Sequence, residues 1–393
     1  MQATVSGSTP RRLPNALTDP PKATLTRRPL IFSLATFLLA LLTIWIMRNH
    51  PDRVLVGDPA IYRQRITEIL DGGWPYLDVP FEHLPVMLVP MFVAWLFGGA
   101  ASQSTYVVVF GVLMAMALAA TTYVLGAVGR NLRAPRSDLR WLLMAIPLLP
   151  LITFRNDPVS VLLAVGGLAL MIRGSSAWVV PAVAGGLAKI WPTVLAWLAW
   201  PRRKASALLV SLSGLLGLLI SLAPGFADRR DAVGVHTETV LGGLVGLWRS
   251  VRSEPVDVVL TTAAYLDVSS WVPAVNVLLG LVVFGFGLSA VRRVEDLRSQ
   301  VVRLGCVVGG VILTSQLFSL QYVLWVVPFL ALSRRRVAVV AGLLLGFLTI
   351  WLGWNWSVEY VESPAFYWIV NARNLVFLGT VIWLAFESPG SET

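Results

Sequence analysis

Asp58 is the first residue whose type and position could carry chemistry. It lies in the polar and aromatic segment Val56–Arg63, where the following Pro59 is typical of a helix start. Asp58 could simply be the N-cap of that helix, and the spacing alone favours this interpretation. The alternative is a catalytic carboxylate at a membrane–water boundary. The two are compatible, because a capping Asp can keep one oxygen free.

Lys189 and Arg373 are cations within apolar segments. A charge at membrane depth costs about 2.5–3.5 kcal/mol on insertion scales, so such residues are functional candidates by default. Arg373 could instead extend its head to the outer interface. A second polar cluster, Arg155-Asn156-Asp157-Pro158, separates two short apolar segments. Here Asp157 could be a helix cap or a functional carboxylate, and the sequence favours neither.

Other polar residues are ambiguous in the same way. His236 and Glu238 occupy a later polar loop, where a histidine is more often plain surface. Gln321 and Tyr322 lie at an expected helix boundary, where aromatic residues commonly form an interfacial belt. No cluster of His and Cys, no Asp-rich oxygen cage and no phosphate-binding glycine loop is visible, so the sequence predicts neither a metal site nor a cofactor.

The amino-acid composition indicates which class of fold positions these residues. Hydrophobic residues make up 56% of the 393 and charged residues only 13%, against about 25% charged in soluble domains. A membrane helix needs about 20 apolar residues. Five stretches without Asp, Glu, Lys or Arg are long enough, namely 84–129, 205–227, 268–291, 304–333 and 337–358. A soluble enzyme, a disordered chain and a β-barrel are excluded, and an all-α polytopic membrane protein is predicted.

We expect about ten spans, or twelve if 177–200 crosses twice rather than forming a re-entrant hairpin. The expected spans are 30–47, 104–128, 140–154, 158–172, 205–224, 272–291, 301–318, 321–333, 337–354 and 368–386. A disordered cytoplasmic tail (1–29) precedes them and a cytoplasmic C-terminal tail (387–393) follows. The first external loop is predicted at 48–103. It contains a surface helix after Asp58 and a juxtamembrane or re-entrant helix at 84–97, broken by Pro85 and Pro90.

The charge of +10 predicts orientation rather than a nucleic-acid partner, because no basic stripe with interleaved aromatic residues is present. With both termini inside, the cytoplasmic segments hold 20 Lys and Arg but only 6 Asp and Glu. The remaining positions hold 11 basic and 15 acidic residues. This asymmetry predicts a multi-pass protein of the plasma membrane, with Asp58 on the outer side.

The first outer loop resembles that of the GT-C glycosyltransferases. The likeness rests on Gly57-Asp58-Pro59-Ala60-Ile61-Tyr62 and Gly73-Trp74-Pro75-Tyr76-Leu77-Asp78, followed by a helix that contains proline. It is nearest to glycosyltransferase family 87, the bacterial α-(1→2)-mannosyltransferases that use polyprenyl-phosphate-mannose. Three later segments fit that family, namely Gly185–Pro192, His236–Val240 and Gln321–Pro328. The family usually has Tyr-Pro-Pro where this chain has His83-Leu84-Pro85.

The resemblance implies a GT-C-like bundle, a polyprenyl-phosphate sugar as donor, often mannose, and a glycan or glycolipid acceptor outside the membrane. It also implies inversion at the anomeric carbon, with Asp58 as the general base. A lipid phosphate that leaves gains charge, so cations must meet it. The candidates are Arg155, Lys189 and Arg373. The expected sugar-binding or acceptor-binding residues are Tyr62, Trp74, Tyr76, Asp157, His236, Glu238, Gln321 and Tyr322.

Two other functions remain open. A transporter or lipid flippase should carry polar sites near the midplane, on broken and repeated helices. Here the polar residues gather on one side instead, which favours an enzyme at the interface. A non-catalytic scaffold of a cell-envelope complex would tolerate the substitution of Asp58 by Asn.

Overall fold

The computed structural model is 77% helical. It describes residues 27–48, 57–99, 101–200, 203–223, 226, 234–256, 258–260, 264–269, 271–315 and 317–387. The predicted N-terminal tail as far as residue 26 and the predicted C-terminal tail from residue 388 lie outside the described residues. Glu387, expected to begin that tail, is instead buried.

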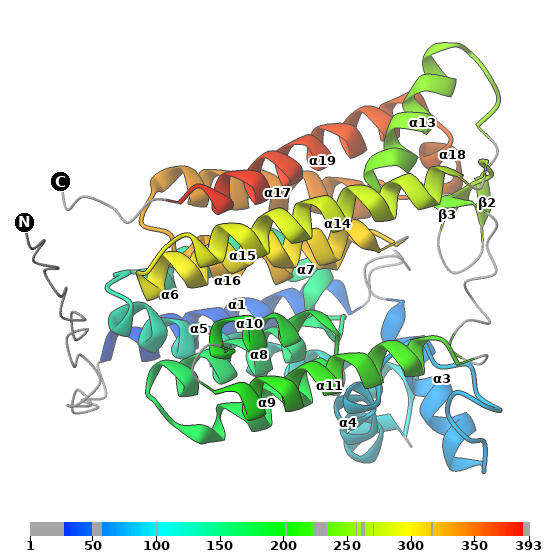
Figure 1. Cartoon of the computed structure of the whole chain (residues 1–393). Coiled ribbons are helices and arrows are strands. Elements are labelled where there is room, and N and C mark those ends of the chain that lie inside the picture. Colours follow the sequence, from blue (N-terminus) through cyan, green and yellow to red (C-terminus); the bar gives the residue numbers. More distant parts are fainter. Residues whose placement is uncertain are drawn as a thin grey trace, which may run out of the picture.

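Seven helices in the described part of the chain are long and apolar enough to cross a membrane. They are α1 (Arg27–Met47), α5 (Gln103–Asn131), α11 (Lys204–Ser221), α14 (Trp271–Arg292), α15 (Leu297–Thr314), α17 (Arg336–Trp354) and α19 (Pro364–Ala385). Each coincides with a predicted span, and the prediction of an all-α polytopic membrane protein is confirmed. Figure 1 shows the start of α1 and the end of α19 at the same end of the bundle.

Three predicted spans are shorter or broken helices. Residues 140–154 fall on α6 (Ser137–Ala145), the 3₁₀ turn η3 (Ile146–Leu148) and α7 (Leu149–Ile152). Residues 158–172 fall on α8 (Asp157–Ile172), and 321–333 on η6 (Leu320–Trp325) and α16 (Val327–Leu332). Prolines in the first turns of η3, α7 and α16 help to set these breaks, since proline removes a backbone donor.

Residues 176–199 form a hairpin of short helices rather than a single span. It consists of η4 (Ser176–Trp178), α9 (Val179–Gly186), η5 (Trp191–Val194) and α10 (Leu195–Ala199). Arg203 donates hydrogen bonds to the backbone oxygens of Ser175 and Gly174, at 3.0 and 2.7 Å. The segment therefore returns to where it began, with Lys189 in the turn between its arms.

The end of the bundle opposite to the start of α1 holds the predicted first-loop helices (Figure 1). These are α3 (Asp58–Leu70), then η1 (Pro85–Met87), α4 (Leu88–Ala94) and the π-helical turn η2 (Trp95–Gly99). Tyr62 and Ile66 share a buried face of α3, whereas Leu70 is exposed. The C-cap of the helix is Asp71, and the following Gly72 has a positive φ of 106°.

A small antiparallel sheet at this end was not predicted. Strands β1 (Val235–His236), β3 (Ala264–Leu266) and β2 (Val258–Leu260) lie in the order β1-β3-β2. His236 pairs with Tyr265, which pairs with Val259 on its other side. Two further helices, α13 (Val240–Val251) and α18 (Val358–Val361), pack against α19. Because β1 ends shortly before α13 begins, the sheet fixes the loop that joins them.

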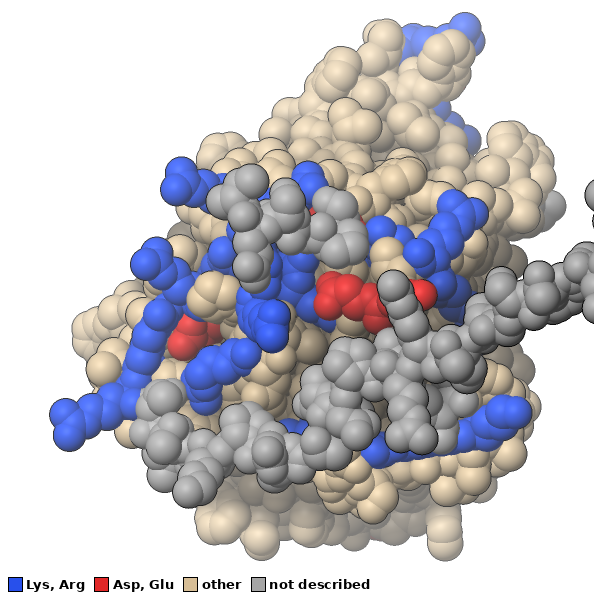
Figure 2. Space-filling view, turned by 60° about the vertical axis from the view of Figure 1, so that its left-hand side comes forward, with Lys and Arg blue, Asp and Glu red and all other residues tan. Residues whose placement is uncertain are grey.

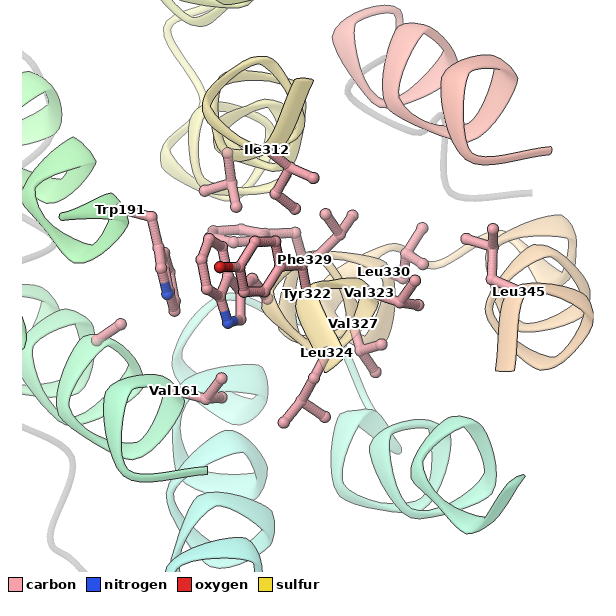
Figure 3. Close-up of a cluster of buried hydrophobic side chains, with 14 of the residues drawn as sticks. Val161, Trp191, Ile312, Tyr322, Val323, Leu324, Val327, Phe329, Leu330 and Leu345 are labelled. Atoms are coloured by element: carbon pink, nitrogen blue, oxygen red, sulfur yellow. The ribbon is translucent and has the colours of Figure 1, made fainter. Parts of the chain in front are cut away.

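The segment η6–α16 is the centre of the core. Figure 3 shows its side chains surrounded by residues from other helices, among them Val161 of α8, Ile312 of α15 and Leu345 of α17. Every residue from 322 to 332 is buried. The core therefore holds one wall of the candidate site, because Tyr322 and Trp325 belong to this same segment.

Candidate active site

Asp58 is held by two donors at the start of α3. Its Oδ2 accepts a hydrogen bond of 3.0 Å from the Tyr62 hydroxyl and pairs with the Arg155 guanidinium. The side chain of Arg155 is 9% exposed, whereas that of Asp58 is 29% exposed. The carboxylate is thus oriented from the protein side and still accessible to a ligand.

Neither candidate aspartate is a helix cap. The N-cap residues of α3 and α8 are Gly57 and Asn156, and no side chain caps either helix. Asp58 and Asp157 are instead the first residues within their helices, where a negative charge is favoured by the helix dipole. The N-cap interpretation of Asp58 was therefore wrong, and both carboxylates are directed to other partners.

Asp157 and Lys189 meet beside two aromatic rings. Asp157 is 2% exposed, and its Oδ1 accepts a hydrogen bond of 2.7 Å from the indole N–H of Trp325. The Lys189 Nζ lies 4.0 Å from that oxygen. It also lies 5.5 Å from the ring centre of Tyr322 and 5.8 Å from that of Trp325. A carboxylate and two π faces therefore hold this ammonium group in place.

Three aromatic rings support that arrangement. Tyr322 and Trp325 stack with ring centres 4.1 Å apart, and Trp325 stacks on Trp191 at 5.9 Å. Trp191 comes from the hairpin, whereas the other two belong to η6 (Figure 3). Tyr322 is only 9% exposed, so much of its ring is covered within the protein.

A cavity of about 680 Å³ lies next to Lys189. Its lining combines the polar residues Glu82, His83 and Lys189 with a long apolar wall from three spanning helices. The wall is formed by Leu215 and Leu218 of α11, Leu281, Phe284 and Leu288 of α14, and Val307 and Val311 of α15. Polar groups together with an extended apolar surface fit an amphiphilic ligand.

Tyr62 connects Asp58 with this cavity. Its ring meets the ring of the cavity-lining His83 edge-on, with centres 5.1 Å apart. Burial raises the pKa of the Tyr62 phenol well above its ordinary value, and the charges of Asp157 and Glu82 raise it further. The phenol is therefore protonated at neutral pH and donates its hydrogen bond to Asp58.

Glu238 and Arg373 form a second ion pair, which is fully buried. The Arg373 Nη1 donates to Glu238 Oε2 at 2.9 Å, and Nη2 donates to the Glu238 backbone oxygen at 2.6 Å. Asn374 accepts from the same guanidinium, whose cationic face lies 4.4 Å from the ring centre of Phe318. Arg373 is 0% exposed, so these contacts leave it no accessible face for a phosphate.

Burial raises the pKa of the Glu238 carboxyl, while Arg373 and, more weakly, Arg155 lower it. Glu238 is therefore within electrostatic reach of the cation that holds Asp58. For His236, burial and the charge of Arg373 lower the pKa to about 3, so its ring is neutral at neutral pH. The His236 Nδ1 accepts the backbone N–H of Glu238 at 3.2 Å. His236 thus shapes the loop that carries Glu238.

Three predicted sugar-binding residues lie outside this cluster. Trp74 is 69% exposed, and its backbone N–H donates to Asp78. The Tyr76 hydroxyl donates a hydrogen bond of 2.6 Å to the backbone oxygen of His83 and thereby helps to hold His83 in place. Gln321, in the first turn of η6, accepts a hydrogen bond of 2.6 Å from Ser319. The other predicted residues form the two groups described above, one around Asp58 and Lys189 and one around Glu238 and Arg373.

Sequence reasoning missed several residues of the site. Glu82 and His83 line the cavity, and the only signal for them was the departure from Tyr-Pro-Pro at His83. Trp191 and Trp325 lay within quoted motifs but without a role. The side-chain amide of Asn156 is buried between Arg155 and Asp157 without a hydrogen-bond partner in the described part of the chain. Nothing in the sequence marked it.

Comparisons of this chain with protein-family models, with curated proteins and with solved structures found no match. The likeness to glycosyltransferase family 87 therefore stays a prediction from short motifs. The function must be argued from the geometry of the site.

Proposed function

We propose that this protein is a membrane glycosyltransferase. It transfers a sugar from a polyprenyl-phosphate donor to a hydroxyl of a glycolipid or polysaccharide of the cell envelope, and the family likeness favours mannose as the sugar. One observation carries the proposal. An accessible carboxylate, Asp58, is oriented by Arg155 and Tyr62, and the Tyr62 ring contacts His83, which lines a cavity that combines a lysine with a long apolar wall.

Asp58 acts as the general base. It accepts the proton of the acceptor hydroxyl as that oxygen attacks the anomeric carbon of the donor. The bond between this carbon and the phosphate oxygen breaks, and the lipid phosphate leaves with the bonding electrons. Attack opposite to the leaving group inverts the anomeric centre. Tyr62, which is protonated and bonded to Oδ2, keeps the carboxylate in position.

Lys189 and Arg155 balance the charge of the leaving phosphate. The Lys189 ammonium lines the cavity and is 15% exposed, so a phosphate in the cavity can reach it. Arg155 pairs with Asp58 and can share its guanidinium between that carboxylate and the phosphate. Arg373 has no such role in this proposal, because its donors are committed to Glu238 and Asn374.

The apolar wall suits the polyprenyl chain. The cavity is lined by α11 on one side and by α14 and α15 on another, and α11 and α14 also carry exposed apolar side chains. A donor could therefore enter from the hydrocarbon region of the bilayer with its phosphate at Lys189. The proposal places the site on the outer side of the plasma membrane, because the opposite end of the bundle is basic (Figure 2).

The test is transfer from labelled polyprenyl-phosphate-mannose to a panel of lipid acceptors by purified protein. Asp58→Asn keeps the shape of the side chain but removes its basicity. We expect it to lower the rate about 100- to 10,000-fold, the usual contribution of a general base. Donor binding, measured separately, should persist, since Lys189 and the cavity are unchanged.

Asp71→Asn is the matched control, because Asp71 is an exposed carboxylate just after the other end of α3. It should retain the wild-type rate. Full activity of a folded Asp58→Asn protein would refute the assignment of the base. Failure of the wild-type protein to transfer any labelled sugar to any acceptor of the panel would count against the whole proposal.

A further inference from the structure

A second cavity, of about 280 Å³, lies at the end of the bundle that holds the start of α1 and the end of α19. It shares no lining residue with the cavity of the candidate active site, although α14 contributes side chains to both. Its walls come from the last turns of α14 and α19 and from the first half of α15. The lining residues are Phe286, Ala290, Arg293, Arg303, Ala385 and Phe386.

The polar part of this cavity is cationic. The Arg303 guanidinium is fixed by hydrogen bonds to the backbone oxygens of Ala290 and Glu387, at 2.7 to 3.1 Å. Arg293 is exposed, and its side chain forms no ion pair with a residue of the described chain. One fixed and one available guanidinium therefore face the same space.

The buried carboxylate of Glu387 acts on Arg303 but is shared with arginines outside the cavity. Glu387 is buried, and its side chain lies 3.6 Å from Arg298 and 3.7 Å from Arg335. Its charge is therefore already surrounded by other arginines. Figure 2 shows Lys and Arg side chains at many places on this end of the molecule, with fewer Asp and Glu among them. The local excess of positive charge is available to an anion from outside the protein.

The other part of the cavity is apolar and partly exposed. The rings of Phe286 and Phe386 meet with centres 5.6 Å apart, and Phe386 is 65% exposed. Phe286 lies on a spanning helix about two turns before Arg293. An occupant must therefore be anionic where it meets the arginines and apolar along the two phenylalanines.

We propose that this cavity binds an anionic phospholipid of the membrane leaflet at the termini end of the bundle. Its phosphate pairs with Arg293, the buried charge of Arg303 adds to the attraction, and one acyl chain lies against Phe286 and Phe386. Charge complementarity selects an anionic headgroup, since basic pockets between spanning helices favour such lipids. The site is independent of the proposed sugar transfer and requires none of its residues.

Native mass spectrometry of the full-length protein in detergent tests this site. Phosphatidylglycerol and phosphatidylcholine with identical acyl chains are added in competition, and bound lipid is counted. We expect the wild-type protein to prefer phosphatidylglycerol. Arg293→Gln should lower that preference about fivefold, the worth of one basic residue near an anionic lipid. Arg293 is exposed, so the variant should fold, and its melting temperature verifies this.

Arg292→Gln is the control, because Arg292 precedes Arg293 but lies over the ring of Trp197 at 3.9 Å, away from the cavity. It should keep the wild-type preference. Equal retention of the two lipids by wild-type protein would overturn the proposal, as would an unchanged preference in folded Arg293→Gln. Glycerol 3-phosphate provides the headgroup alone. If it displaced the lipid at equal concentration, the site would bind soluble phosphates instead.

Discussion

The charged residues of the site fall into two groups, according to whether a substrate can reach their side chains. Asp58 is paired but 29% exposed, so a substrate can reach it. Glu238 and Arg373 are paired and almost completely enclosed. A buried pair gives little net stability against an apolar pair, but removal of one partner leaves an isolated charge at high cost. Access therefore separates the residue that can do chemistry from those that maintain the structure around it.

Arg373→Met should lower the free energy of unfolding by about 3–5 kcal/mol, because Glu238 would remain buried without its partner. Glu238→Gln should have an effect of similar size. The double variant should lose less than the sum of the two, since no unpaired charge remains. Unfolding in mixed micelles of increasing denaturing detergent measures all three. Additive effects would mean that the two side chains do not depend on each other.

The sequence could identify candidate residues but not their partners. Lys189 and Arg373 stand out because a charge is costly within an apolar segment, and Asp58 stands out because it precedes a proline at a helix start. The partners are remote, since Trp325 is 168 residues from Asp157 and Glu238 is 135 residues from Arg373. No local pattern encodes such pairs. The helix-cap interpretation of Asp58 failed for a related reason, because Arg155 from a remote segment and Tyr62 hold its carboxylate instead.

Among the elements, α14 and α15 show the closest packing. A Cβ at Gly287 would lie 2.8 Å from the backbone nitrogen of Val307, and one at Gly310 would lie 2.5 Å from the Phe284 backbone. The absence of side chains lets the two helices approach, as in other membrane bundles. Because both helices line the large cavity, their separation sets the width of its apolar wall.

Gly287→Ala should destabilise the bundle by about 1–3 kcal/mol, as overpacking of a close contact does. Gly285→Ala is the matched control, since a Cβ there would meet nothing within 4 Å. That control should be neutral or slightly stabilising, because alanine favours helix over glycine. Thermal denaturation of the two variants compares them directly. Equal melting temperatures would show that α14 and α15 do not need this contact.

Helix type was predictable from the sequence, whereas helix length was not. Hydropathy reports composition, so 140–154, 158–172 and 321–333 resembled spans. The structure gives them short or broken helices, and the prolines at 147, 150 and 328 mark three of the breaks. The small sheet escaped prediction because its strands have only two or three residues, too few for an alternating pattern.

Across the whole molecule, charge differs between the two ends of the bundle. Basic residues follow α5 and α14 and precede α15 and α17, all at the end seen in Figure 2. The opposite end carries Asp58, Glu82 and Glu238. The bias of basic residues toward the cytoplasm predicts that the end seen in Figure 2 lies inside the cell.

Labelling of single cysteines in intact cells tests this orientation. Arg130→Cys places a thiol at the basic end and Arg252→Cys places one at the opposite end, and both positions are exposed. The native Cys306 is buried, and Cys306→Ala removes it from the background. A membrane-impermeant thiol reagent should label only position 252 before lysis and both positions afterwards. Labelling of position 130 alone in intact cells would show that the topology is the reverse of the predicted one.

The pairing of Glu238 with Arg373 also orders the biogenesis of the protein. Glu238 is synthesised 135 residues before its partner, so during that interval its carboxylate lacks this counterion. The insertion of α19 is unfavourable for Arg373 unless that carboxylate is already in place. Insertion of the last described helix therefore depends on the loop that carries Glu238, and a chain arrested before α19 would keep an uncompensated buried charge.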